Sequence, residues 1–335
     1  MRALAITQHG APLQEIEGPD PVPAAAEALV RVEAAGICRS DVHYRAGTRP
    51  VPGLPLVPGH EIAGTVVAAD GIRPGTRVAV HYLETCGACD ACRRGAEQFC
   101  ASGRMIGLDR EGGYATHVVV PVRNLHPIPD GVPTSAAAVM MCSTATSFHA
   151  LRRAGLQPGE RVAVLGAGGL GMSAIRLAAL MGAGEVFAVD INPKKLKAAE
   201  RSGAIPVDGT GDVVGELRGR VDVALELVGL PSLMRTGLEI LAPGGRAVAV
   251  GITDDSFPLD PFKDLVLREV HLIGSADHLS DEIRMLFEMA GRGDLDVSDL
   301  VTNKVALDAG AVNGAMDRLE GFGDDIRTVI TPAAL

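Results

Sequence analysis

The stretch Arg161-Val-Ala-Val-Leu-Gly166-Ala-Gly168-Gly169-Leu-Gly171 decides the fold of the second part of this chain. Its first five residues predict a buried strand, and the apolar run 172–181 that follows predicts a helix. Gly166 allows a tight turn, Gly168 lets the backbone approach a pyrophosphate, and Gly171 permits close helix packing. Free N–H groups at the helix start attract an anion. The stretch therefore predicts a strand, turn and helix that bind a nucleotide.

Asp190 ends the next predicted strand, 19 residues after Gly171. A carboxylate at this point accepts hydrogen bonds from the adenosine ribose and repels an added 2′-phosphate, which favours NAD over NADP. A glycine-rich turn without a ligand is the competing interpretation. The strand, the helix and Asp190 together favour the nucleotide.

The remaining pattern divides the chain into two kinds of structure. Short β-branched strands broken by Gly and Pro predict an antiparallel, barrel-like domain, with strands at 28–34, 62–68, 77–81 and 115–120. Apolar strands that alternate with helices predict a parallel sheet covered on both faces, with strands at 161–165, 185–190, 221–226, 246–250 and 270–274. An amphipathic helix at 281–292 and a strand at 326–331 return the tail to the first domain.

Composition limits the function classes. With 335 residues, 47% of them apolar, the chain has enough material for two cores. A formal charge of −10 without a long Lys/Arg run argues against nucleic acid as a partner. The sequence contains no apolar window long enough to span a membrane and no signal peptide at its start, so we expect a cytoplasmic protein without membrane contact. In that reducing compartment its six cysteines are free for metals or chemistry.

Four of the cysteines lie in one short loop. Cys86, Cys89 and Cys92 occur at every third position, and Cys100 follows eight residues later. Four thiolates that converge on a tetrahedral Zn²⁺ leave no position for a substrate, so we expect a zinc ion that stabilises this lobe. An iron–sulfur cluster or a redox disulfide pair is the alternative.

The octapeptide Gly-Ile-Cys-Arg-Ser-Asp-Val-His, residues 36–43, contains one of the two remaining thiols, Cys38. The other is Cys142, and His60 stands in a Pro-Gly-His-Glu turn before a strand. Two thiolates and an imidazole could form a zinc site with an open fourth position. Each residue also has a simpler explanation, because a buried Cys can be a small apolar side chain and a lone His a satisfied polar group. Spacing alone leaves both open.

Six motifs together resemble those of the zinc-containing medium-chain alcohol dehydrogenases, in the same order and over nearly the whole chain. These are Gly-Ile-Cys-Arg-Ser-Asp (36–41), Pro-Gly-His-Glu (58–61), the cysteine loop (86–100), Glu-Gly-Gly-Tyr-Ala (111–115), Gly-Ala-Gly-Gly-Leu-Gly (166–171) and Ile-Arg-Thr (326–328). The resemblance implies an α/β protein with a GroES-like β-barrel catalytic domain and a Rossmann doubly wound parallel sheet that binds NAD. We expect residues 1–143 and 277–335 in the first domain and 144–276 in the second, with the active site between them.

The resemblance also implies roles for particular residues. Cys38, His60 and Cys142 become ligands of a catalytic zinc, with Glu61 close to the metal and Asp41 behind His60. Ser40 and His43 become a proton relay. The residues expected to bind the cofactor are Arg39 and Arg327 on the pyrophosphate, Asp190 and Lys195 on the adenosine ribose, Thr146 against the nicotinamide, and Gly166, Gly168, Gly169, Leu170, Gly171 and Val250 around the nucleotide.

The expected function is NAD-dependent oxidation of a primary or secondary alcohol to an aldehyde or ketone, with one catalytic and one structural zinc per chain. A polyol dehydrogenase or one that oxidises a thiol adduct of formaldehyde is an alternative within the family, although polyol members often have a carboxylate where Cys142 stands. A non-catalytic nucleotide-binding regulator is the alternative from another class. We expect a homodimer or homotetramer, and a pocket lined by either His81 or Tyr82.

Overall fold

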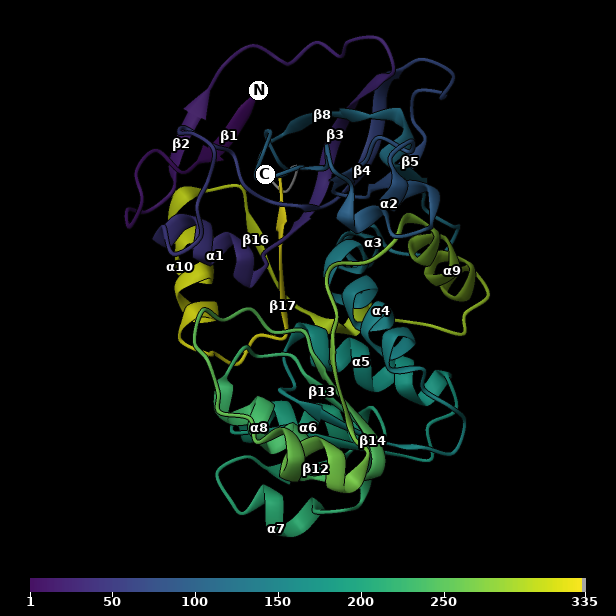
Figure 1. Cartoon of the computed structure of the whole chain (residues 1–335). Coiled ribbons are helices and arrows are strands. Elements are labelled where there is room, and N and C mark those ends of the chain that lie inside the picture. The colour runs from purple at the N-terminus through teal and green to yellow at the C-terminus, as the bar shows by residue number, and fades with distance from the viewer. Residues whose placement is uncertain (333–335) are drawn as a thin grey trace. The chain divides into compact units, whose positions relative to one another are not determined.

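A computed structural model describes residues 1–332 and divides the chain into two compact units (Figure 1). The first unit comprises Met1–Cys142 and the described tail that begins at Leu279. The second unit is the continuous segment Ser143–His278. The tail therefore belongs to the first unit, although the whole second unit separates the two pieces in the sequence.

The first unit is built on a sheet in which strands pair in the order β16-β17-β3-β4-β5-β9, with β8 also paired to β3. Its pairs are antiparallel except β16 with β17, which run parallel because a helix connects them. Two separate two-stranded antiparallel sheets, β1 with β2 and β6 with β7, lie outside this sheet. The strands are β1 (Arg2–Ala5), β2 (Gln14–Glu17), β3 (Glu27–Gly36), β4 (Glu61–Ala69), β5 (Arg77–Val80), β6 (Leu83–Glu84), β7 (Arg104–Met105), β8 (His117–Pro121), β9 (Leu125–Pro127), β16 (Val301–Ala306) and β17 (Arg327–Thr331).

Helices pack against the strands of this sheet and against each other. Helix α1, near the N-terminus, and helix α10, near the C-terminus, lie side by side (Figure 1). Helix α3 packs on β3 and β4 and continues into a π-helical turn at Met140–Thr144. The α-helices are α1 (Arg39–Ala46), α2 (Asp90–Arg93), α3 (Thr134–Val139), α9 (Ser280–Gly291) and α10 (Ala309–Glu320). Short 3₁₀ turns occur at Glu97–Phe99, Val122–Asn124 and Ser298–Leu300.

The second unit contains a six-stranded sheet in the order β12-β11-β10-β13-β14-β15, with every pair parallel. From β10 the chain adds β11 and then β12 on one side of the sheet. It then returns to the centre and adds β13, β14 and β15 on the other side of β10. Ligands of such sheets bind at the carboxyl ends of the strands where the order reverses, which here is the end of β10 and β13. The strands are β10 (Arg161–Leu165), β11 (Glu185–Asp190), β12 (Ile205–Asp208), β13 (Val221–Glu226), β14 (Leu241–Ala249) and β15 (His271–Gly274).

The helices of the second unit connect its strands, except α4, which precedes β10. They are α4 (Ala145–Ala154), α5 (Gly169–Leu180), α6 (Pro193–Arg201), α7 (Val213–Leu217) and α8 (Pro231–Glu239), with a π turn at Pro261–Leu265 and a 3₁₀ turn at Val266–Arg268. The strand residues Val162–Leu165 and Val223–Leu225 are almost completely buried, which explains their unbroken apolar character. The expected mixture of a mainly antiparallel domain and a doubly wound parallel sheet is therefore confirmed.

Some element boundaries differ from the sequence-based expectation. Helix α5 begins at Gly169, three residues before the predicted 172, because the last glycines of the turn already form its first turn. Helices α1 and α10 and strand β16 were not among the elements predicted from the sequence. Among residues 1–332, no helix combines the length and the apolar character needed to cross a membrane.

Candidate active site

Three neighbouring strands place the side chains of the candidate metal site at one end of the first unit's sheet. In the pairing of β3 with β4, Gly36 lies opposite Glu61. This register brings Cys38, two residues beyond Gly36, close to His60, the residue before Glu61. On the other side of β3, the Ile37 N–H donates to the Thr328 carbonyl, which places Arg327 at the same end.

Cys142 joins this group from the π-helical turn that follows α3. A π turn inserts one residue into a helix and is often found at functional sites. The donor atoms of Cys38, His60, Glu61 and Cys142 all lie within 4.8 Å of one another, and all four residues are buried. The structure therefore brings together side chains that are up to 104 residues apart in the sequence.

The spacing of these donors fits a zinc ion. The sulfur atoms of Cys38 and Cys142 are 4.0 Å apart, too far for a disulfide. Two thiolates at about 2.3 Å from a tetrahedral zinc are about 3.8 Å from each other. The Cys142 thiol lowers the pKa of Cys38 well below its usual range, which favours the thiolate form that binds zinc. Two thiolates and an imidazole would leave a fourth position open.

Asp41 supports this donor set from the third position of α1. One of its carboxylate oxygens, Oδ2, accepts a hydrogen bond from the Cys38 N–H at 2.9 Å. The other, Oδ1, lies 3.5 Å from Nδ1 of His60. With Nδ1 turned to the carboxylate, the imidazole has Nε2 for a metal, which is the arrangement expected of a metal-binding histidine.

Glu61 and Arg327 form a buried ion pair beside the same group. Nη2 of Arg327 donates to Oε2 of Glu61, and neither side chain is appreciably exposed. Burial raises the pKa of Glu61 to about 7, although the Arg327 guanidinium acts in the opposite direction. A Cβ atom at position 36 would lie only 1.9 Å from Oε2 of Glu61, so only glycine at this position leaves room for the carboxylate.

The remaining polar residues of the octapeptide lie on or next to α1. The Ser40 hydroxyl lies 3.8 Å from the Cys38 sulfur. His43, three residues further along the helix, has Nδ1 3.1 Å from the Thr48 hydroxyl. Burial, followed by the charge of Arg39, lowers the pKa of His43. Arg39 donates to the Leu319 carbonyl and stacks over the Phe322 ring at 4.2 Å.

The four-cysteine loop forms a second cluster in the first unit. Its sulfur atoms lie 3.9 Å apart for Cys86 and Cys92, 3.5 Å for Cys89 and Cys92, and 3.9 Å for Cys89 and Cys100. These distances are close to the edges of a tetrahedron around zinc and far longer than a disulfide bond. Because the four thiolates would fill all positions, the cluster fits a structural ion.

The glycine turn of the second unit has the geometry of a nucleotide site. Gly166 has a φ of +100°, which favours glycine, and a Cβ at Gly171 would lie 1.8 Å from the Gly166 carbonyl oxygen. A Cβ at Gly168 would meet nothing within 4 Å, so the space above that backbone is open. Asp190 accepts hydrogen bonds from the N–H groups of Ala167 and Asn192 through separate oxygens. The carboxylate thus lies at the turn and retains lone pairs for a ligand.

The other residues expected at the nucleotide lie on α4, α5 and α6 and directly after β14, all in the second unit. Gly169 and Leu170 open α5, Thr146 is buried on α4, and Val250 follows β14 and donates its N–H to the Glu226 carbonyl. Lys195, on α6, is 9% exposed and has no hydrogen-bond or ion-pair partner within residues 1–332. A lysine side chain without a protein partner can bind an anionic or hydroxylated ligand.

The structure distinguishes Tyr82 from His81, which the sequence could not. The Tyr82 ring meets the His60 imidazole edge to face, with centroids 5.0 Å apart. The His81 ring lies 6.2 Å from that of His126. Of the two residues, Tyr82 is therefore the one beside the candidate metal site.

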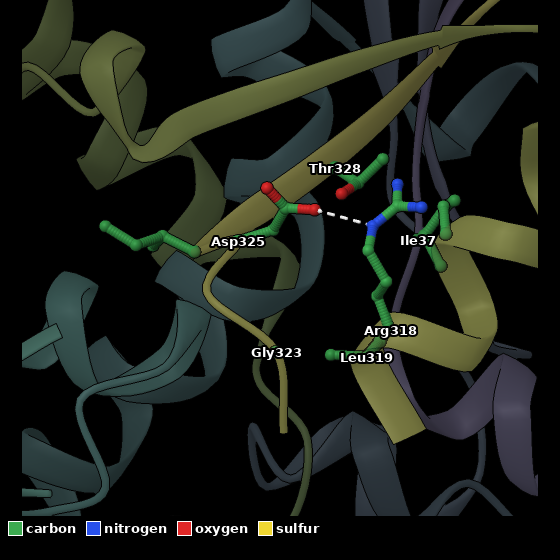
Figure 2. Close-up of a pocket in the computed structure, with 8 residues that line it drawn as sticks. Ile37, Arg318, Leu319, Gly323, Asp325 and Thr328 are labelled. Atoms are coloured by element: carbon green, nitrogen blue, oxygen red, sulfur yellow. Dashed lines mark hydrogen bonds and ion pairs between the residues drawn. The ribbon is translucent and has the colours of Figure 1, made fainter. Parts of the chain in front are cut away.

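Figure 2 shows a pocket near this site in the first unit. Its lining includes Ile37 and Thr328, which adjoin Cys38 and Arg327 in the sequence. Arg318 and Asp325 also line it and bind each other across 3.3 Å. Since the pocket's charged pair is satisfied internally and its other lining residues are mostly apolar, it adds no ligand to the metal site.

Comparisons with known proteins find one family match in the first unit and a separate one mainly in the second. Residues 24–130 match the model of the alcohol dehydrogenase GroES-like domain, and residues 169–291 match that of the zinc-binding dehydrogenase. The chain is 33% identical to an NAD-dependent alcohol dehydrogenase of Sulfurisphaera tokodaii, over 99% of this chain and 100% of that protein. It is 35% identical to NADP-dependent alcohol dehydrogenase C 1 of Mycolicibacterium smegmatis, over 73% and 74%.

A solved structure gives the same result. The alcohol dehydrogenase of the archaeon Aeropyrum pernix superposes with a TM-score of 0.90 and 28% identity, over 99% of this chain and 100% of that one. The fold and the two cysteine-containing sites define an oxidoreductase with a GroES-like and a nucleotide-binding domain. The chain belongs to the zinc-containing medium-chain dehydrogenase family.

Two features of the site were not foreseen from the sequence. The pairing of Arg327 with Glu61 joins residues 266 positions apart, and no local pattern signals it. Tyr114 was visible within the Glu-Gly-Gly-Tyr-Ala motif, but nothing in the motif shows which residues its side chain reaches.

Proposed function

We propose that this protein is a zinc-dependent alcohol dehydrogenase that transfers a hydride between a primary or secondary alcohol and NAD. The observation that carries the proposal is the buried group of Cys38, His60 and Cys142, with Glu61 beside it. Family membership supports it further, because both a curated relative and a solved structure are named as alcohol dehydrogenases.

Each polar residue of the site has a separate proposed role. When bound, zinc acts as a Lewis acid on the alcohol oxygen and NAD accepts the hydride. Ser40 would accept the hydroxyl proton as it gives up its own, and the His43 ring would accept a proton in turn and release it to solvent. Arg39 and Arg327 supply positive charge for the pyrophosphate, and Nε of Arg327 has no partner within the described residues. Tyr82, whose ring contacts His60, would line the substrate pocket beside the metal site.

A panel of alcohols tests the reaction directly. NADH formation is measured by absorbance with primary, secondary and polyhydroxylated alcohols, and NADP replaces NAD in parallel assays. Turnover of at least one simple alcohol, abolished by removal of zinc, supports the proposal. A zinc content of one per chain and no turnover of any alcohol would instead support a nucleotide-binding protein without catalysis.

The choice of cofactor is tested by Asp190→Gly. This carboxylate lies at the glycine turn, where a 2′-phosphate would bring a second negative charge. Such a like-charge contact costs several kcal/mol, so its removal is expected to raise the ratio of kcat/KM for NADP to that for NAD by about tenfold or more. Asp190→Asn keeps two polar atoms at the turn and serves as the control for lost hydrogen bonds. An unchanged ratio would remove the argument for NAD.

The protein is also proposed to form a dimer or tetramer through the second unit. Strand β15 is an edge of the parallel sheet, with one side unpaired among the described strands. Phe262, Val266 and Leu267 just before it are about 60% exposed, and Leu272 on it is 39% exposed. An exposed apolar group beside a free strand edge is typical of an interface. We expect sedimentation to give at least twice the 34.6 kDa of one chain; a monomer at micromolar concentration would contradict this.

A further inference from the structure

Residues 111–114, the Glu-Gly-Gly-Tyr motif, hold the turn that presents His60. The N–H groups of Gly112, Gly113 and Tyr114 donate to the carbonyls of Val57, Gly59 and Pro58, at 2.8, 2.7 and 3.0 Å. The Glu111 carboxylate accepts a hydrogen bond from the Val57 N–H at 2.7 Å. Every residue of the turn before His60 is therefore tied to this motif.

The Tyr114 ring packs directly on the backbone of this turn. Gly59 has a φ of +97°, and a Cβ there would lie 2.3 Å from Cδ1 of Tyr114. The two segments of the chain also approach closely at Gly112, where a Cβ would lie 2.3 Å from the Gly59 carbonyl oxygen. The glycines are thus required for this contact, and the position of the Tyr114 ring is fixed.

The Tyr114 hydroxyl reaches Asp41. It donates to Oδ2 at 2.9 Å, the same oxygen that accepts the Cys38 N–H. The Gly59 N–H donates to the other oxygen, Oδ1, at 3.2 Å, and His60 Nδ1 faces that oxygen. Tyr114, Asp41 and His60 are all essentially inaccessible to solvent. Hydrogen bonds to a buried carboxylate are stronger than those between neutral groups, so this contact holds the carboxylate firmly.

We propose that Tyr114 is a positioning residue whose hydroxyl fixes the Asp41 carboxylate, and through it orients His60 for the buried metal. The inference rests on the metal site proposed above, and it adds a residue that does not touch the metal itself. The direct partner of a metal-binding histidine, here Asp41, tunes the affinity of the site by factors of about 10 to 100, and the Tyr114 hydroxyl acts on this partner.

Tyr114→Phe tests the proposal because it removes only the hydroxyl. Zinc affinity is measured by competition with a chelator, and the four-cysteine zinc serves as the internal reference. We expect one zinc per chain to bind about tenfold more weakly and the other to remain unchanged. With cobalt in place of zinc, the visible absorption of the variant should shift as well. Tyr44→Phe is the matched control, since its hydroxyl contacts Met105 sulfur, and we expect wild-type zinc affinity.

Asp41→Asn tests whether Tyr114 affects zinc affinity through Asp41 or through a general effect on the structure. If Tyr114 acts through Asp41, adding Tyr114→Phe to Asp41→Asn should weaken zinc binding by much less than tenfold, because coupled residues are not additive. Equal zinc affinity of wild type and Tyr114→Phe would overturn the proposal, as would equal weakening of both zinc ions. If wild type itself binds only the four-cysteine zinc, the proposed metal site fails instead.

Discussion

Cys38→Ala is expected to remove one of two zinc ions per chain and to lower kcat for alcohol oxidation by about a thousandfold. A Lewis acid on the reacting oxygen contributes several kcal/mol, and about 4 kcal/mol corresponds to that factor. Cys38 supplies one of two sulfurs that face each other across 4.0 Å, so its loss leaves a single thiolate and an imidazole. Metal analysis and steady-state NADH formation measure the two effects.

Cys89→Ala is the matched control for the loss of a thiolate. It removes a donor from the four-cysteine loop, so we expect loss of the other zinc and a lower free energy of unfolding. The two variants should therefore each retain one zinc, but at different sites. If Cys38→Ala kept both full zinc content and full NADH production, the assignment of the catalytic site would be wrong.

Ser40→Ala is expected to lower kcat by about a hundredfold while the dissociation constant of NADH stays unchanged, because a positioned proton acceptor contributes at least that factor. The hydroxyl lies 3.8 Å from the sulfur of Cys38, one of the proposed metal ligands. Alanine is favourable in a helix, and Ser40 lies in the first turn of α1, so the fold should tolerate the change. Stopped-flow turnover and NADH fluorescence titration measure the two quantities.

Ser40→Thr distinguishes a proton relay from simple packing. It keeps a hydroxyl at the same position, so we expect most of the activity to return, apart from losses due to the added methyl group. A near-normal kcat for Ser40→Ala would eliminate Ser40 as the proton acceptor. A rise in the NADH dissociation constant equal to the loss of kcat/KM would assign the residue to cofactor binding instead.

Local patterns were sufficient for the features whose parts are close together in the sequence. The turn at Gly166–Gly171 requires glycine at two positions. Gly166 has a positive φ, and a Cβ at Gly171 would collide with the Gly166 carbonyl oxygen. The four-cysteine loop brings its thiols together because short spacings leave them little freedom. Alternation of strands and helices likewise predicted the parallel sheet, since each βαβ unit is determined within about thirty residues.

Only the tertiary structure decided the features that depend on strand register and on packing between distant segments. The pairing of Gly36 with Glu61 sets Cys38 beside His60, and a π turn brings Cys142 to them. The same packing turns Tyr82, and not His81, toward His60.

The sequence by itself thus determined the family, the nucleotide turn and the presence of enough thiols for two metal sites. The tertiary structure decided which groups surround the buried site, including the ion pair of Arg327 with Glu61 and the hydrogen bond from Tyr114 to Asp41. The physical reason is that these contacts join residues 73 to 266 positions apart. Their geometry follows from the register of β17, β3 and β4 and from close backbone contacts at Gly59, which no local spacing encodes.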